Sequence, residues 1–358
     1  MRLPTSIIGV LFQDYGAQMA EPCMSPDAGV ARYEPTASNR LIPWIAVGTA
    51  LAYPWTLRLF HDAITAQTES VFPAVWLILA FALPLACLLF AWRAGNALPT
   101  VRRVAFVALT APPLFVLTGV VSSLLHSPIR DIWTWSALWL ALGIGAAVAG
   151  SGAPSQPVDA MSARLRVLHG VSGLAVLMFV AFHLTNHLTG LFGPALHAHV
   201  MAMGRVVYRS RLVEPVLVAV LLFQVASGFR LAWQGSRRPL DAAKVMQVGS
   251  GAYLAAFILT HLNSAFVSAR WVHKIPTDWA WAIGAPDGLL RDAWNIRLLP
   301  HYALGVFFVI AHLFCGLRTV LLAHGVRQST ANRVWASGLS LAGGVALLIT
   351  AALCGLRI

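Results

Sequence analysis

Repeated apolar runs, each about 20 residues long, constrain the fold of this chain more than any other feature. A run of that length is long enough to cross the ~30 Å hydrocarbon core of a membrane as one helix. Hydrophobic residues make up 58% of the 358 positions, and charged residues only 11%. Because backbone groups in lipid must find their hydrogen-bond partners within the chain, the runs predict an all-α, polytopic membrane helix bundle.

About nine transmembrane helices are expected. The runs lie at 43–61, 72–92, 104–125, 132–150, 165–187, 212–233, 245–268, 301–322 and 335–355. Proline removes a backbone donor, and Pro54, Pro84, Pro112 and Pro113 therefore predict kinks within the first three runs.

The net charge of +12 is interpreted as membrane topology and not as nucleic-acid binding, because the basic residues lie between the apolar runs. If the N-terminus is cytoplasmic, 15 of the 25 Lys and Arg residues fall on the inner side. The first forty residues contain no hydrophobic region followed by a small-residue cleavage site, so no signal peptide is expected. The expected location is the inner (cytoplasmic) membrane, with many passes through the lipid bilayer and a cytoplasmic N-terminus.

The chain divides into two membrane segments. Residues 151–163, "SGAPSQPVDAMSA", are rich in Gly, Pro and Ser and are expected to form a linker. A polar tail is expected at 1–42, a four-helix segment of undetermined role at 43–150, and a five-helix segment at 164–358. Histidines are rare inside the apolar runs of the first segment and frequent inside those of the second.

The second segment repeats itself. Its first and third helices share the pattern Ser-Gly, nine residues, His-Leu, which contains Gly173 and His183 in one and Gly251 and His261 in the other. Its second and fourth helices share the pattern [QH]-x3-G-x-R, which contains Gln224, Gly228 and Arg230 in one and His312, Gly316 and Arg318 in the other.

Two of these histidines are expected at the same depth. His183 lies 17 residues after Arg166, and His261 lies 17 residues after Lys244. At ~1.5 Å per residue, both rings lie ~26 Å from the inner surface, so they are expected to face each other.

A pair of imidazoles inside a membrane needs a partner, because an unsatisfied polar group costs several kcal/mol in hydrocarbon. His183 and His261 are therefore interpreted as the two axial ligands of a haem b. The alternative is that they only hydrogen-bond to the backbone or to Thr185, Asn186 and Asn263 nearby.

The repeated glycines and arginines fit the same interpretation. A residue without Cβ allows a flat macrocycle or a neighbouring helix to approach closely, so each glycine is a candidate for cofactor lining or for helix packing. Arg230 and Arg318 are candidates for pairing with haem propionates, or for extending to the inner surface.

Three stretches resemble a known family. "RVLHGVSGLAVLMFVAFHL", "VMQVGSGAYLAAFILTHL" and "HYALGVFFVIAHLFCGLRTVLLAHG" resemble the first, third and fourth helices of the cytochrome b membrane anchor of succinate:quinone oxidoreductases, that is, of succinate dehydrogenase and fumarate reductase. The type resembled is a single subunit of five helices that carries two haems b. The resemblance covers roughly residues 164–357 and leaves the N-terminal four helices without a counterpart.

The resemblance implies an outer haem held by His183 and His261 and an inner haem held by the residues at 224 and 312. Position 312 is His, but position 224 is Gln, and an amide is a poor iron ligand beside imidazole. The inner haem is therefore expected to be absent, with His312 alone or another residue as the alternative ligand. One haem b is expected and two are possible.

The resemblance also implies partners and a substrate. Flavoprotein and iron-sulfur subunits are expected to dock on the cytoplasmic side, and membrane quinone is expected to exchange electrons with the complex, so this chain is expected to be a non-catalytic subunit. Candidate quinone residues are His169 and Ser172 near the inner edge, and His301 and His187 on the outer side.

Two competing functions remain open. Buried histidines also relay protons in transporter-like membrane proteins. A b-haem subunit of another quinone-linked dehydrogenase would carry the same ligands. A reduced-minus-oxidised spectrum distinguishes a transporter-like protein from a haem protein. Co-purification with a flavin-containing subunit distinguishes the succinate dehydrogenase-like anchor from the subunit of another quinone-linked dehydrogenase.

Overall fold

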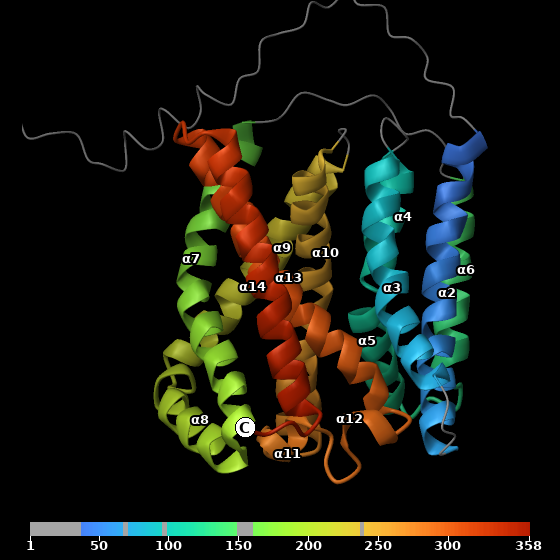
Figure 1. Cartoon of the computed structure of the whole chain (residues 1–358), viewed down its shortest axis with the longest axis vertical. Coiled ribbons are helices and arrows are strands. Elements are labelled where there is room, and N and C mark those ends of the chain that lie inside the picture. The colour runs from blue at the N-terminus through green and yellow to red at the C-terminus, as the bar shows by residue number, and fades with distance from the viewer. Residues whose placement is uncertain (1–36, 67–70, 95–98, 149–159, 237–239) are drawn as a thin grey trace, which may run out of the picture.

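The computed structural model describes residues 37–66, 71–94, 99–148, 160–236 and 240–358, and within these ranges it contains helices and no strands. Long helices run side by side through the molecule (Figure 1). The first segment contains α2 (Ala37–Thr65), α3 (Phe72–Arg93), α4 (Pro99–Leu109), α5 (Ala111–Leu124) and α6 (Asp131–Val148). The second contains α7 (Ala160–Thr189), α8 (Pro194–Tyr208), α9 (Val213–Gly235), α10 (Ala242–Leu262), α11 (Trp279–Ala282), α12 (Gly288–Arg291), α13 (Leu298–Ala323) and α14 (Gln328–Leu353).

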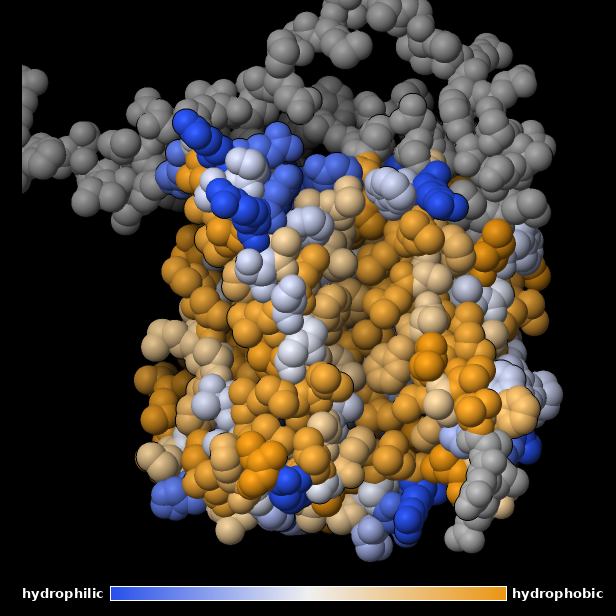
Figure 2. Space-filling model, viewed as in Figure 1, coloured by the Kyte–Doolittle hydropathy of each residue, from blue (hydrophilic) through white to orange (hydrophobic). Residues whose placement is uncertain are grey.

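The protein is an all-α bundle of membrane-spanning helices. Among the described residues, seven helices are long and apolar enough to cross a membrane, or eight if the bent pair α4 and α5 counts as one span. The remaining predicted span, 43–61, lies within α2, a helix of 29 residues that contains Arg58 and Asp62 and is not among these candidates. Figure 2 shows a hydrophobic band across the visible face, with hydrophilic residues gathered above it.

Only parts of the predicted tail and of the predicted linker lie within the described residues. Residues 1–36 of the predicted tail and residues 151–159 of the predicted linker lie outside the described residues. Helix α7 already begins at Ala160, inside the range assigned to the linker.

The third predicted span is broken. α4 ends at Leu109, α5 begins at Ala111, and the two helices are bent by 64°. Pro112 and Pro113 occupy the first turn of α5 and cannot donate to the carbonyls of the preceding turn, which stops α4. The predicted kink is therefore present, but the expectation of one continuous helix over 104–125 is wrong.

The N-terminal segment packs against the second segment. One core cluster contains Tyr53, Leu109 and Phe115 from the first segment together with Tyr253 of α10 and Phe308 of α13. Tyr253 and Phe308 are completely buried. The two segments therefore share a hydrophobic core on this side of α10.

A buried ion pair also joins them. Arg297, immediately before α13, donates to Asp131 at the start of α6, and its guanidinium lies 4.5 Å from the centre of the Phe115 ring. The Arg297 side chain is 8% exposed and that of Asp131 is 25% exposed. Water can therefore solvate the carboxylate better than the guanidinium, and the charge of Arg297 relies more on the ion pair for its stabilisation.

Asp131→Ala is expected to destabilise the folded protein by about 2–4 kcal/mol, because removing one partner leaves a buried charge uncompensated. The measurement is the thermal unfolding midpoint in detergent, with Asp287→Ala, which removes a carboxylate for which the structure shows no ion pair, as the matched control. An unchanged midpoint would show that the ion pair does not hold the segments together.

The connection between α7 and α9 is also helical. The stretch "GPALHAHVMAMGR", which lies between the predicted spans 165–187 and 212–233, forms α8, which begins at Pro194 after Gly193 has taken a positive φ of 115°. α8 packs against α7 and α9 and buries His197 and Met201. At the same end of the molecule, α10 continues as a π-helix over Asn263–Val272.

Candidate functional site

A large cavity runs through the second segment. Its volume is about 2620 Å³, well above the ~300–1,000 Å³ of ordinary ligand pockets. The walls come from α7, α9, α10, α13 and α14, and from α8 near one end. The cavity extends from Arg166 and Lys244, at the end called inner below, to Thr277 and Asp278, at the end called outer, and most of its lining is apolar.

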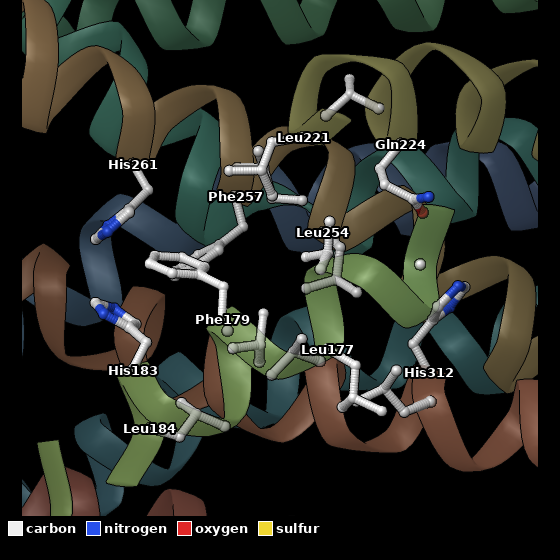
Figure 3. A pocket seen from close by; sticks show the side chains of 18 of the residues that line it. Leu177, Phe179, His183, Leu184, Leu221, Gln224, Leu254, Phe257, His261 and His312 are labelled. Carbon is white, nitrogen blue, oxygen red and sulfur yellow. The ribbon is translucent and has the colours of Figure 1, made fainter. Parts of the chain in front are cut away.

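His183 of α7 and His261 of α10 face each other across the outer half of this cavity (Figure 3). Their ring centres are 6.0 Å apart and the ring planes make an angle of 70°. Two imidazoles bound to one metal ion through nitrogen bonds of ~2 Å have ring centres about 6 Å apart. The spacing therefore fits a pair of axial ligands, and the rings meet as their equal depth in the sequence predicts.

Neither ring is held by a hydrogen bond among the described residues, although hydrogen bonding to nearby polar groups was the alternative role for this pair. Asn186 contacts His197 instead, with 3.2 Å between the amide nitrogen and Nε2. Ring nitrogens of His183 and His261 thus remain available to a ligand in the cavity.

A phenylalanine supports each ring. Phe179 stacks on His183 with ring centres 5.5 Å apart, and Phe257 stacks on His261 with ring centres 5.6 Å apart. Each phenylalanine lies one helical turn before its histidine, so the two helices repeat the same arrangement of Ser-Gly, Phe and His. Stacking restricts the rotation of both imidazoles and keeps them aimed at the cavity.

The inner half of the cavity contains a second pair of imidazoles. Figure 3 shows Gln224 and His312 pointing toward each other, as the sequence predicts. The ring nearest to His312, however, is that of His169, with ring centres 6.3 Å apart and an angle of 83°. His169, which the sequence suggested only as a quinone candidate, is therefore the histidine that lies beside His312.

Serine hydroxyls hold both inner rings. His169 Nδ1 lies 2.7 Å from Ser227 Oγ of α9, and His312 Nδ1 lies 3.0 Å from Ser250 Oγ of α10. Gln224 Nε2 donates to the His169 carbonyl and to Ser172 Oγ at 2.8 and 2.6 Å, so hydrogen bonds fix its amide against α7.

Further polar side chains line the outer end. Ring centres are separated by 4.7 Å between His183 and His187, by 5.5 Å between His187 and His197, and by 4.6 Å between His197 and Trp279. Burial, with an added contribution from Arg205, lowers the pKa of His197 on α8 to about 4, so this ring is neutral at physiological pH.

Several polar atoms at this end are buried without a hydrogen-bond partner among the residues that the structure describes. They are Asn186 Oδ1, His187 Nδ1, His197 Nδ1, Arg205 Nε, Asn263 Nδ2 and Trp279 Nε1. Buried polar atoms are nearly always paired in folded proteins. A cluster of unpaired atoms beside a cavity therefore indicates a polar ligand or bound water at the outer end.

The repeated glycines all line the cavity: Gly173, Gly228, Gly251 and Gly316. A Cβ at Gly228 would lie 3.3 Å from the His169 ring, and one at Gly251 would lie 3.2 Å from the His312 ring. A Cβ at Gly173 would be 3.7 Å from the Gln224 amide, whereas Gly316 faces open space. Gly228 and Gly251 thus make room for the inner imidazoles.

The predicted arginines lie elsewhere. Arg318 is 9% exposed and donates to Asn332 of α14, and Arg230 is exposed, so neither lines the cavity. The cations that do line it are Arg166 and Lys244 at the inner end and Arg205, Arg209 and Arg270 at the outer end. Arg270 is paired with Glu214.

The remaining quinone candidates, Ser172, His187 and His301, do not lie together in one site. Ser172 donates to the Leu168 carbonyl and accepts from Gln224 beside His169. His187 lines the outer half of the cavity. His301 is 2% exposed and packs on Phe257, 4.5 Å between ring centres, behind the cavity wall.

The described residues contain two imidazole pairs in one cavity, and among them no group of three or more His, Cys, Asp or Glu side chains is placed to hold a metal ion. Two imidazoles complete the coordination of an iron atom whose other ligands come from a macrocycle, so the donor set fits haem. Comparisons of the chain with protein-family models, with curated proteins and with solved structures returned no match.

Proposed function

We propose that this protein is a haem b-containing membrane anchor and electron-transfer subunit. It would pass electrons between an iron-sulfur subunit and membrane quinone in a complex like succinate dehydrogenase or fumarate reductase. The observation that carries the proposal is the pair His183 and His261, two imidazoles that make no hydrogen bond to the described residues and whose ring centres are 6.0 Å apart in a membrane cavity.

The chain supplies ligands, shape and charge to the cofactor. His183 and His261 would bind the iron, and the stacked Phe179 and Phe257 would hold their rings in place. Arg205 and Arg209, which line the outer end, are suited to haem carboxylates. A bound haem b supplies one-electron chemistry, and its potential depends on its axial ligands, on burial and on nearby hydrogen bonds.

The partners follow from the resemblance of residues 164–357 to the anchor family. Flavoprotein and iron-sulfur subunits would dock on the cytoplasmic side, where Arg166 and Lys244 line the inner end of the cavity. The proposed location is the cytoplasmic membrane with the N-terminus inside, supported by the excess of Lys and Arg on that side. Co-purification with a flavin-containing subunit would distinguish this complex from another quinone-linked dehydrogenase.

Quinone would exchange electrons with the complex at one end of the cavity. The outer end offers Arg205 as a donor to a quinone carbonyl oxygen, because Arg205 lines the cavity and its buried Nε has no hydrogen-bond partner among the described residues. His187 lies between His197 and His183. The inner candidates, His169 and Ser172, are already engaged with Ser227 and Gln224.

A second function is favoured by the row of rings at the outer end. The ring centres of His183 and His187 are 4.7 Å apart, and those of His187 and His197 are 5.5 Å apart. Chains of buried histidines also relay protons in membrane transporters. The two functions predict different absorption spectra for the purified protein. A reduced-minus-oxidised spectrum of the purified protein is expected to show b-type bands, and a colourless protein would contradict the haem proposal in favour of the relay.

A further inference from the structure

The inner imidazole pair repeats the geometry of the outer pair. The ring centres of His169 and His312 are 6.3 Å apart, compared with 6.0 Å for His183 and His261, and both pairs cross at steep angles of 83° and 70°. Both pairs line the same cavity. His169 and His183 are 14 residues apart on α7, which separates the two levels by ~21 Å along the helix.

Hydrogen bonds to serine fix which nitrogen of each inner ring is free. Ser227 Oγ donates its proton to the Phe223 carbonyl at 2.6 Å, so it accepts from the Nδ1–H of His169. Ser250 Oγ donates to the Gln247 carbonyl at 3.1 Å, so it accepts from the Nδ1–H of His312. Both rings then carry their lone pair on Nε2, the neutral form that binds a metal.

Space and charge around the inner pair suit a flat, anionic ligand. Gly228 and Gly251 place no side chain against the two rings, and Gly316 faces open cavity. Arg166 and Lys244 line the same end and can pair with carboxylates. Apolar side chains, including Leu177, Leu221 and Leu254, line the space between the two levels (Figure 3).

We propose that His169 and His312 together bind a second haem at the inner end of the cavity, with Ser227 and Ser250 orienting the two rings. This inference rests on the proposed function, because it uses the same cofactor. It assigns the inner ligand to α7, whereas the anchor family would take it from position 224 on α9. The amide of Gln224 instead fixes the backbone of His169 and the hydroxyl of Ser172.

The first test is the haem content of the purified full chain and its His169→Ala and His312→Ala variants, measured by the pyridine haemochrome assay. The unchanged protein is expected to hold two haems per chain. Each variant is expected to lose one haem or to convert one from the low-spin to the high-spin form, and the double variant is expected to lose no more than one. Retention of the outer haem in the same preparation shows that the variant has folded.

Other haem contents would contradict the inner site, the assignment of His169 or the proposed function. Two low-spin haems in His169→Ala would overturn the assignment of His169, and a raised KM for quinone in that variant would make it a quinone residue instead. One haem in the unchanged protein would overturn the inner site and leave the proposed function standing. A protein without haem would overturn both.

The positioning role of the serines has its own readout. Ser227→Ala and Ser250→Ala are each expected to weaken binding of the inner haem by about 10–100-fold, because loss of a partner that orients a ligand typically has that effect. The measurement is haem transfer to excess apomyoglobin, with the outer haem as the internal reference. Ser227→Thr keeps the hydroxyl and is expected to restore binding. Equal loss rates in all three variants and the unchanged protein would contradict the role.

Discussion

His183→Ala and His261→Ala are each expected to remove the outer haem completely, and with it one equivalent of haem per chain. Under the proposal each imidazole would be one of two ligands to the iron, and a haem with one ligand missing would be bound more weakly. Phe179 and Phe257, which stack on the two rings, offer no donor atom that could replace either imidazole. The measurement is the amplitude of the b-type bands together with the haem-to-protein ratio.

The control for this experiment is His199→Ala. His199 is an exposed histidine on α8, two residues after the buried His197, and it does not line the cavity. Its replacement is expected to leave the spectrum unchanged. Unchanged bands in both His183→Ala and His261→Ala would contradict the ligand assignment, because the haem would then be held by other residues.

The positions of the membrane-spanning helices could be predicted from the sequence because they follow from the lengths of the apolar runs alone. The predicted span 301–322 lies within α13, Leu298–Ala323, and the predicted span 212–233 coincides with α9, Val213–Gly235, to within two residues at each end. A kink was predicted from Pro112 and Pro113, but its division of the span into two helices at Thr110 was not, because hydropathy measures only composition and the effect of the prolines depends on the carbonyls of the preceding turn.

The outer pair could be predicted because His183 and His261 occupy equivalent positions in a repeat. The inner pair could not, because depth was counted from the nearest basic residue. His169 lies three residues after Arg166 and His312 six residues before Arg318, which suggests different levels. The difference is ~4.5 Å, less than one helical turn, and side chains of this length bridge it. One sequence signal was present: the dipeptide Ser-Gly at 227–228 and at 250–251 supplies the hydroxyl and the glycine beside each inner ring.

The connection at the outer end was also missed. Its sequence contains Gly193, Pro194 and two histidines, which are typical of a loop. The same Gly-Pro pair begins α8, because proline fits the first turn of a helix and Gly193 takes the positive φ that precedes it. His197 is brought beside Asn186 and Trp279 only by the way α8 packs, which the sequence does not specify.

Gln224→His in a His169→Ala background is expected to restore the second haem, raising the haem content from one to two per chain. Gln224 and His312 point toward each other across the inner end of the cavity (Figure 3), so an imidazole at 224 would approach the same iron from α9. With the His169 ring removed, the space that this ring fills against Gly228 becomes available to the new side chain.

The matched control is His169→Ala with Gln224→Leu, which places an apolar side chain of similar volume at position 224 and is expected to keep one haem. Restoration by His but not by Leu would show that positions 169 and 224 flank a single iron site opposite His312. Failure of both double variants, while His169→Ala alone still loses one haem, would mean that the inner site accepts a ligand only from α7. In that case a histidine at position 224 cannot replace His169 as a ligand. The hydrogen bond between His169 and Ser227 would then be needed to build the site.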